Sequence, residues 1–163
     1  MGPGRAGLLT VLKRGFGAAL VVLLVAAGCG QQTVRMTPPE AEASTTEVCA
    51  DLVSALPDTL MDADRAPVEP DTKTMAAWGD PPIGLRCGVP RPSELSAHSY
   101  LSRINGVDWL PQPEDEPTLY TAIGRTAYVE VQVPPSYGPP AAALSTVSEL
   151  IDERIPPLPD GTL

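Results

Sequence analysis

The chain has 163 residues, of which 43% are hydrophobic but only 4% aromatic, and its 20 acidic residues outnumber 11 basic ones. This length leaves room for one small folded domain after a leader segment is removed. The negative charge disfavours nucleic acid and anionic lipid surfaces as partners, because both would repel the chain.

Residues 1–28 have the layout of a signal peptide. Residues 1–14 carry three basic side chains and no acidic one, and an apolar run over residues 16–27 follows. A helix that crosses a bilayer needs about 20 apolar residues, so this run is too short for a permanent anchor. Removing the three basic residues of the leader from 11 leaves eight against 20 acidic residues, a net charge of −12.

A cysteine follows the leader directly, at the end of the segment Leu-Val-Ala-Ala-Gly-Cys that finishes at Cys29. This segment resembles the bacterial lipoprotein signal, in which the cysteine thiol is acylated before the leader is cleaved at its amino side. One position departs from that pattern, because Ala26 stands where a larger aliphatic residue is usual. We expect Cys29 to carry a lipid such as palmitate and to hold the exported protein at the outer face of the cell membrane; plain secretion after cleavage and an uncleaved anchor are the alternatives.

Residues 29–46 are predicted to be a flexible tether, because a stretch rich in Gln, Thr, Pro, Glu, Ala and Ser buries too little apolar surface to offset its ordering entropy. A helix is expected over residues 45–56. Ser44 and Glu47 have the spacing of a capping box, and Pro57 ends the run. The apolar residues of its buried face are Val48, Cys49, Leu52, Val53 and Leu56.

Cys49 and Cys87 remain when Cys29 is assigned to the lipid. An even cysteine pair in an oxidising compartment is expected to form a disulfide, which would connect the first helix to a short strand over residues 83–87. The alternative is a free Cys87 that His98 activates as a nucleophile.

Between these cysteines, residues 65–68 are a candidate edge strand, and residues 74–78 fit either a helical turn or extended chain. The clearest turn signal is Asn105-Gly106, because this pair supplies the positive φ angles of a two-residue type I′ turn. In the resulting hairpin over residues 101–110, three cross-strand pairs are expected: Ile104 with Val107, Ser102 with Trp109, and Arg103 with Asp108.

An acidic, proline-rich loop is expected over residues 111–117, followed by strands over residues 118–123 and 126–133. In the second of these, valines alternate with Tyr128, Glu130 and Gln132, as in a strand that buries one face. A last helix begins after Pro139-Pro140 and ends at Pro156, with its apolar stripe at Leu144, Val147, Ile151 and Ile155.

This order of elements predicts an α+β domain over residues 47–156, with a tail over residues 157–163. An antiparallel sheet of about four to five strands would carry the N-terminal and C-terminal helices on one face.

Several short motifs occur in this order: Trp78-Gly79-Asp80-Pro81-Pro82, Leu85-Arg86-Cys87-Gly88, Asn105-Gly106-Val107-Asp108-Trp109, and Gly124-Arg125 before a valine-rich strand. Together they resemble the domain of unknown function 3515 family, an actinobacterial family of small envelope proteins, over about residues 49–153. The resemblance implies a membrane-attached or secreted location. It implies no activity and no catalytic residue.

The candidate binding surface consists of Trp78, Asp80, Arg86 and Arg125, which the predicted elements place in loops or at strand ends, where binding residues gather. In the structural alternative, Trp78 belongs to the core and the two arginines pair with acids such as Asp80. Asp80 and Asp108 could instead form the carboxylate pair of a glycan hydrolase, although Asp108 already has a partner in Arg103.

Metal and cofactor sites have little support in the sequence. The chain has a single histidine, His98, whereas a zinc site needs three or four ligands. Residues 114–116 are all acidic, but they lack the glycine and the spaced oxygen ligands of a calcium loop, so a solvated loop is expected. No cofactor is predicted.

Two functional hypotheses follow from these observations. The favoured one is a noncatalytic envelope lipoprotein that binds an envelope protein or a cell-wall component. The alternative is a small wall-directed hydrolase or transferase that uses acidic residues.

The lipid anchor can be tested by changing Cys29→Ala and fractionating cells. The variant should leave the membrane fraction for the medium or accumulate as an unprocessed precursor, because acylation needs the thiol. Normal processing and membrane retention of the variant would refute the anchor.

Overall fold

A computed structural model describes residues 1–2 and 32–159 of the chain. The predicted acylation site Cys29 and almost all of the predicted leader lie outside these ranges. Within them, no helix is both long enough and apolar enough to cross a membrane.

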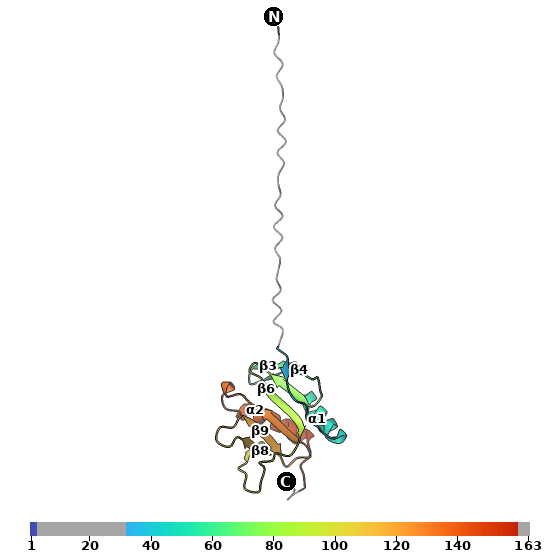
Figure 1. The fold of residues 1–163 in the computed structure, drawn as a ribbon, viewed down its shortest axis with the longest axis vertical. Helices are drawn as coiled ribbons and strands as arrows, with labels where there is room; N and C mark the ends of the chain where they lie inside the picture. The colour runs from blue at the N-terminus through green and yellow to red at the C-terminus, as the bar shows by residue number, and fades with distance from the viewer. Residues whose placement is uncertain (3–31, 160–163) are drawn as a thin grey trace.

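An eight-stranded, fully antiparallel sheet forms the centre of the domain (Figure 1). In spatial order its strands are β2 (Thr59–Leu60), β3 (Ala63–Ala66), β5 (Met75–Trp78), β6 (Ile83–Val89), β10 (Tyr128–Gln132), β9 (Leu119–Ile123), β8 (Val107–Gln112) and β7 (Ser102–Ile104). Two short strands, β1 (Val34–Arg35) and β4 (Val68–Glu69), pair in parallel as a separate ladder. The α+β class is confirmed, but the expectation of four to five strands is too low, because strands of two to four residues are too short to show an alternating pattern.

Two helices, α1 (Ala43–Ala55) and α2 (Ala141–Arg154), pack with the sheet. Their apolar stripes and the residues on one face of the sheet form a single core, so both helices cover the same face, as expected. The largest fully buried side chains in it are Trp78, Trp109, Leu52, Ile83, Leu85, Leu144, Ile151 and Ile155. A short 3₁₀ helix, η1 (Pro135–Tyr137), lies between β10 and α2.

The two tryptophans of the core each have a partner for the indole N–H. Trp78 Nε1 donates to the carbonyl oxygen of Pro57 at 2.9 Å, and Trp109 Nε1 donates to Ser148 Oγ at 2.9 Å. Both indoles can therefore be fully buried without leaving a polar group unsatisfied. These bonds also connect β5 to the end of α1, and β8 to α2.

The predicted disulfide between Cys49 and Cys87 is present, with a Cα–Cα distance of 5.4 Å. Both cysteines are completely buried, so the bond attaches α1 to β6 inside the core. The alternative of a free, reactive Cys87 is therefore wrong for this structure.

The hairpin of β7 and β8 has the predicted register, with Ser102 opposite Trp109, Arg103 opposite Asp108 and Ile104 opposite Val107. The turn residues Asn105 and Gly106 have φ angles of 45° and 79°, as a type I′ turn requires. Arg103 Nε and Nη2 both donate to the carboxylate of Asp108 at 2.7 Å.

The N-terminal boundary of the domain differs from the prediction. Helix α1 begins at Ala43, and the backbone carbonyl of Glu42 accepts bonds from the backbone and hydroxyl of Thr46, so the predicted capping box is not formed. Part of the predicted tether also belongs to the domain, because β1 pairs with β4 and Arg35 forms an ion pair with Glu69 at 2.9 Å.

The predicted loop over residues 111–117 is shorter than expected, since β8 continues through Pro111 to Gln112. The last pair between β7 and β8 joins Ser102 and Trp109, so β8 is an edge strand on that side at Pro111. A proline is tolerated there because a backbone N–H at this position would have no partner on β7.

Arg125 connects three parts of the fold. Its guanidinium donates to the carbonyl oxygen of Ile155 at 3.1 Å, to that of Gly106 at 3.3 Å, and to Asp152 Oδ1 at 2.7 Å. Ile155 caps α2, Gly106 lies in the β7–β8 turn, and Arg125 itself follows β9. Because only 6% of the residue is exposed, these bonds replace those that the guanidinium would make with water.

The disulfide is expected to contribute about 4 kcal/mol to the free energy of unfolding in the chain-entropy model, given a sequence separation of 38 residues. Changing both cysteines to serine should lower this free energy by that amount in urea denaturation. Intact-mass analysis of the parent should show two alkylatable thiols at these positions only after reduction. Thiols that react before reduction would contradict the bond.

The buried arginine gives a second prediction. Arg125→Met should lower the free energy of unfolding by about 2–4 kcal/mol, because carbonyl groups at the end of α2 and in the hairpin turn lose their donor. Arg103→Met is the matched control and should have a much smaller effect, because its ion pair lies at the surface. Equal losses in urea denaturation would contradict the structural role of Arg125.

Candidate functional site

The face of the sheet that the helices leave uncovered carries the candidate site. Side chains alternate along each strand, so the residues between the core positions point to this face. One cross-strand row on it consists of Arg86, Glu130, Thr121 and Leu110, and the next consists of Gly84, Gln132, Leu119 and Gln112. The floor of the site is therefore largely polar, in contrast to the apolar core on the other side.

Three adjoining hollows cross these rows, and we call them together the groove. The first, the Tyr100 hollow, has a volume of about 470 Å³ and is lined by Glu94, Ser99, Tyr100, Leu110, Pro111, Gln112, Pro113 and Glu114. A middle hollow of about 380 Å³ shares Glu94 and Gln112 with it. A third hollow of about 200 Å³ shares Arg86 and Glu130 with the middle one.

The segment of residues 90–101 forms one wall of the groove. Leu95 anchors it, because this side chain is buried against Leu110 and Ile123 in a small cluster separate from the main core. Ser99 holds the bend of the segment, as its hydroxyl accepts from the backbone N–H of Ser96 at 2.9 Å. Tyr100 follows and is 66% exposed. The segment thus presents an aromatic ring at the rim of the Tyr100 hollow.

Residues 35–37 line the third hollow, at the other end of the groove. Met36 lies so close to Gly84 that a Cβ on this glycine would be 3.1 Å from the methionine sulfur. The carbonyl oxygen of Thr37 accepts a bond from Arg86 Nη1 at 3.3 Å. This part of the chain, predicted to be a free tether, therefore shapes the end of the groove.

The polar groups of the floor are connected to one another. Arg86 and Glu130 form an ion pair on neighbouring strands, with Nη2 2.6 Å from Oε1. Thr121, which is almost completely buried, donates to Gln112 Oε1 at 3.2 Å, and Gln112 Nε2 donates to Glu94 Oε2 at 3.1 Å. These bonds hold the side chains of the floor and of one wall in fixed directions.

The structure does not bring the four predicted surface residues together. Trp78 is core, and Arg125 is buried at the ends of β9 and α2. Asp80 is exposed in the turn between β5 and β6, whereas Arg86 lies in the middle of β6. The structural alternative therefore holds for Trp78 and for both arginines, since Arg125 pairs with Asp152 and Arg86 with Glu130, and neither pairs with Asp80.

Arg86 is the only member of this set that lines the groove among the described residues. The acidic partner of Arg86 is Glu130, whereas the prediction gave Asp80 as an example of such a partner. Sequence spacing could not identify this pair, because 44 residues separate the two side chains along the chain.

Asp80 and Asp108 do not form a carboxylate pair. Asp108 is opposite Ile123, the last residue of β9, and therefore lies beside the β9–β10 turn. Asp80 precedes Ile83, the first residue of β6, and therefore lies at the other end of the strands. The hydrogen bonds from Arg103 hold the pKa of Asp108 below its usual value. Asp108 is therefore an ionised partner of an arginine at neutral pH.

Two further pKa shifts belong to the core and not to the groove. Burial lowers the pKa of Arg65, whose guanidinium lies 5.1 Å from the centre of the Trp78 ring and donates to two carbonyl groups at the end of α1. Burial also raises the pKa of Tyr120, whose hydroxyl donates to the carbonyl oxygen of Pro117 at 2.8 Å. Both residues are structural.

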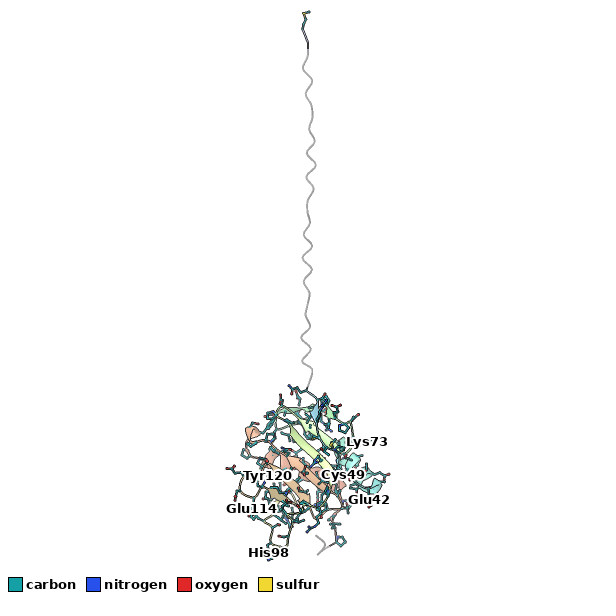
Figure 2. All side chains as sticks on the ribbon, in the orientation of Figure 1. Glu42, Cys49, Lys73, His98, Glu114 and Tyr120 are labelled. Carbon is teal, nitrogen blue, oxygen red and sulfur yellow. A yellow bond between two sulfur atoms is a disulfide. The ribbon has the colours of Figure 1, made fainter. Side chains whose placement is uncertain are left out.

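His98 is exposed in the segment of residues 90–101 (Figure 2). In the described part of the chain, no three or more His, Cys, Asp or Glu side chains are grouped so that they could hold a metal ion. Glu114, Asp115 and Glu116 are all exposed, as expected of a solvated loop.

Sequence reasoning missed most residues of the groove. No sequence motif includes Tyr100, Glu94 or Gln112. These residues lie close together because residues 90–101 fold back over the sheet. The alternation in β10 did predict that Glu130 and Gln132 point away from the core. Nothing in the sequence indicated that this outward face is hollowed.

Comparisons with known proteins agree with the resemblance noted in the sequence. No curated protein and no solved structure matches the chain significantly. The family model described as "Protein of unknown function (DUF3515)" matches residues 16–159, which is most of the chain. The chain therefore belongs to the DUF3515 family of proteins of unknown function.

Proposed function

We propose that the chain is a noncatalytic binding protein of the cell envelope, attached to the outer face of the membrane through Cys29 and binding its ligand in the groove. The observation that carries this proposal is the groove itself. It is hollowed into a sheet face with a polar, internally bonded floor, and its largest hollow lies beside an exposed aromatic side chain. Concave sites that combine apolar or aromatic walls with a few polar groups held in place are the usual sites of ligand binding.

The position of β1 supports an orientation in which the Tyr100 hollow lies at the end of the domain away from the membrane, while the third hollow lies near the anchor. Cys29 precedes Val34 by five residues, so an extended chain would place the lipid at most about 17 Å from β1. Figure 1 shows β1 and β4 at one end of the domain, and Figure 2 shows Glu114 and His98 at the other. The Tyr100 hollow would then be open to envelope components outside the membrane.

The disulfide supports a rigid binding surface. Cys87 is fixed to α1 in the core, and the adjacent residue Arg86 points to the groove. A surface whose side chains are already ordered loses little entropy when it binds a partner.

The chemistry of the carboxylates favours binding over hydrolysis. Glu94 and Glu114 both line the Tyr100 hollow, but both are exposed to solvent. The general acid of a glycan hydrolase must hold its proton at neutral pH, which requires a dry, apolar environment. Glu130 is already paired with Arg86. These groups are better suited to hold a ligand than to cleave one.

Photo-cross-linking in cells tests this proposal. A photoreactive amino acid at Tyr100 should give one dominant cross-linked product, whereas the same group at Glu47, which is exposed on α1, should not. Arg86→Ala should reduce the Tyr100 product several-fold, because it removes the ion pair from the floor of the groove.

Two results would refute the proposal. One is an identical set of products from both positions, which would mean that the groove has no specific ligand. The other is turnover of wall glycan or wall peptide by the purified chain that is lost in Glu94→Gln or Glu114→Gln.

A further inference from the structure

We infer that the Tyr100 hollow binds the cationic side chain of a lysine or arginine in an extended peptide. This inference rests on the proposed function and specifies the ligand of the same groove. It follows from the charge, the hydrogen-bonding groups and the shape of the hollow.

The charge of the hollow is negative. Glu94 and Glu114 are its only charged lining residues, and neither forms an ion pair within the described part of the chain. The basic groups of the groove, Arg35, Arg86 and Arg91, line the middle and third hollows instead. A positively charged group is therefore attracted to the Tyr100 end, and an anionic ligand is repelled from it.

The free hydrogen-bonding groups of the hollow are mainly acceptors. Gln112 uses its amide oxygen for Thr121 and one amide N–H for Glu94. The hydroxyl of Ser99 donates to the backbone carbonyl of Glu94 at 3.2 Å. Pro111 and Pro113 have no backbone N–H to offer. The carboxylate oxygens that remain match an ammonium or guanidinium group, which has several donors and no acceptor.

The walls of the hollow fit the apolar stem of such a side chain. Leu110 and Pro111 are buried beneath it, and Pro113 and the exposed Tyr100 stand at its rim. Lysine and arginine bury their methylene groups against surfaces of this kind while the charged head remains near water. The tyrosine ring adds a cation–π attraction to the head group.

The shape of the whole groove points to a peptide and not to a free amine. From β8 the groove crosses β9 and β10 to β6, and at about 4.8 Å per strand this spacing corresponds to about 15 Å. An extended chain of four or five residues has this length. At the far end, Arg86, Glu130 and Gln132 provide charged and amide groups that can bond to a peptide backbone.

Binding of short blocked peptides to the full-length chain in neutral detergent tests the inference. The probe is a five-residue alanine peptide with a central lysine, and the matched probe has norleucine, which keeps the stem and lacks the charge. The lysine peptide should bind at least about tenfold more tightly, and its affinity should fall as salt is added.

Variants of the two glutamates test whether the lysine peptide binds in the Tyr100 hollow. Glu94→Gln and Glu114→Gln should each weaken binding of the lysine peptide about tenfold while leaving the norleucine peptide unaffected. Glu153→Gln makes the same change of charge on the exposed surface of α2 and should have no effect. Equal affinities for the two peptides, or tight lysine binding by the double variant Glu94→Gln/Glu114→Gln, would overturn the inference.

The two experiments distinguish a failure of this inference from a failure of the proposed function. If the lysine peptide does not bind but the Tyr100 cross-link still forms and still depends on Arg86, the groove is a binding site and its ligand is not cationic. If neither is observed, both proposals are wrong.

Discussion

The covalent bond between Cys49 and Cys87 is the constraint on which the two faces of the domain depend. β6 lies in the middle of the sheet, between β5 and β10, and the disulfide fixes it to α1. Cys87 points to the core, whereas its neighbour Arg86 points to the groove, because successive side chains of a strand face opposite ways. The same short stretch of chain therefore closes the core and positions the floor of the candidate site.

A core with few aromatic residues needs such a constraint. The only phenylalanine of the chain is residue 16, in the predicted leader, so Trp78 and Trp109 supply the largest apolar surfaces of the described domain. Each indole N–H is bonded to a group on or next to a helix, which fixes the positions of α1 and α2 over the sheet. With the helices on one side only, the other face stays open and can be polar.

Elements that depend on local chemistry were predicted well from the sequence. The Asn-Gly pair determined the β7–β8 hairpin and its register, and the cysteine count predicted the disulfide. The stripe of α2 and the alternation of β10 were also confirmed. These predictions were correct because turn geometry and burial depend on residues that are close in sequence, and because only one pair of cysteines was left to form a disulfide.

Features that depend on distant contacts could not be predicted in this way. β2, β3 and β5 contain two to four residues each and are strands only because neighbours complete their ladders. β1 was predicted to be part of a tether, but its residues pair with residues of β4 that lie 34 positions further along the chain. The groove arises when residues 90–101 fold over β8 and β9, and no local pattern encodes that placement.

The motifs that identify the family mostly support the fold. Trp78 is bonded to Pro57 in the core, and Asp108 is held by Arg103. Arg125 joins α2 to two turns. Among the charged motif residues, Arg86 alone contributes to the groove of the described chain.

The side chains proposed to determine ligand specificity lie outside those motifs. Tyr100 and Glu94 belong to the wall segment, and Glu114 belongs to the loop after β8. A change in these segments would alter the charge and shape of the Tyr100 hollow without disturbing the tryptophans, the disulfide or Arg125. The motifs of this chain therefore account for its scaffold and for Arg86 in the groove, while the proposed ligand is inferred from the residues that line the Tyr100 hollow.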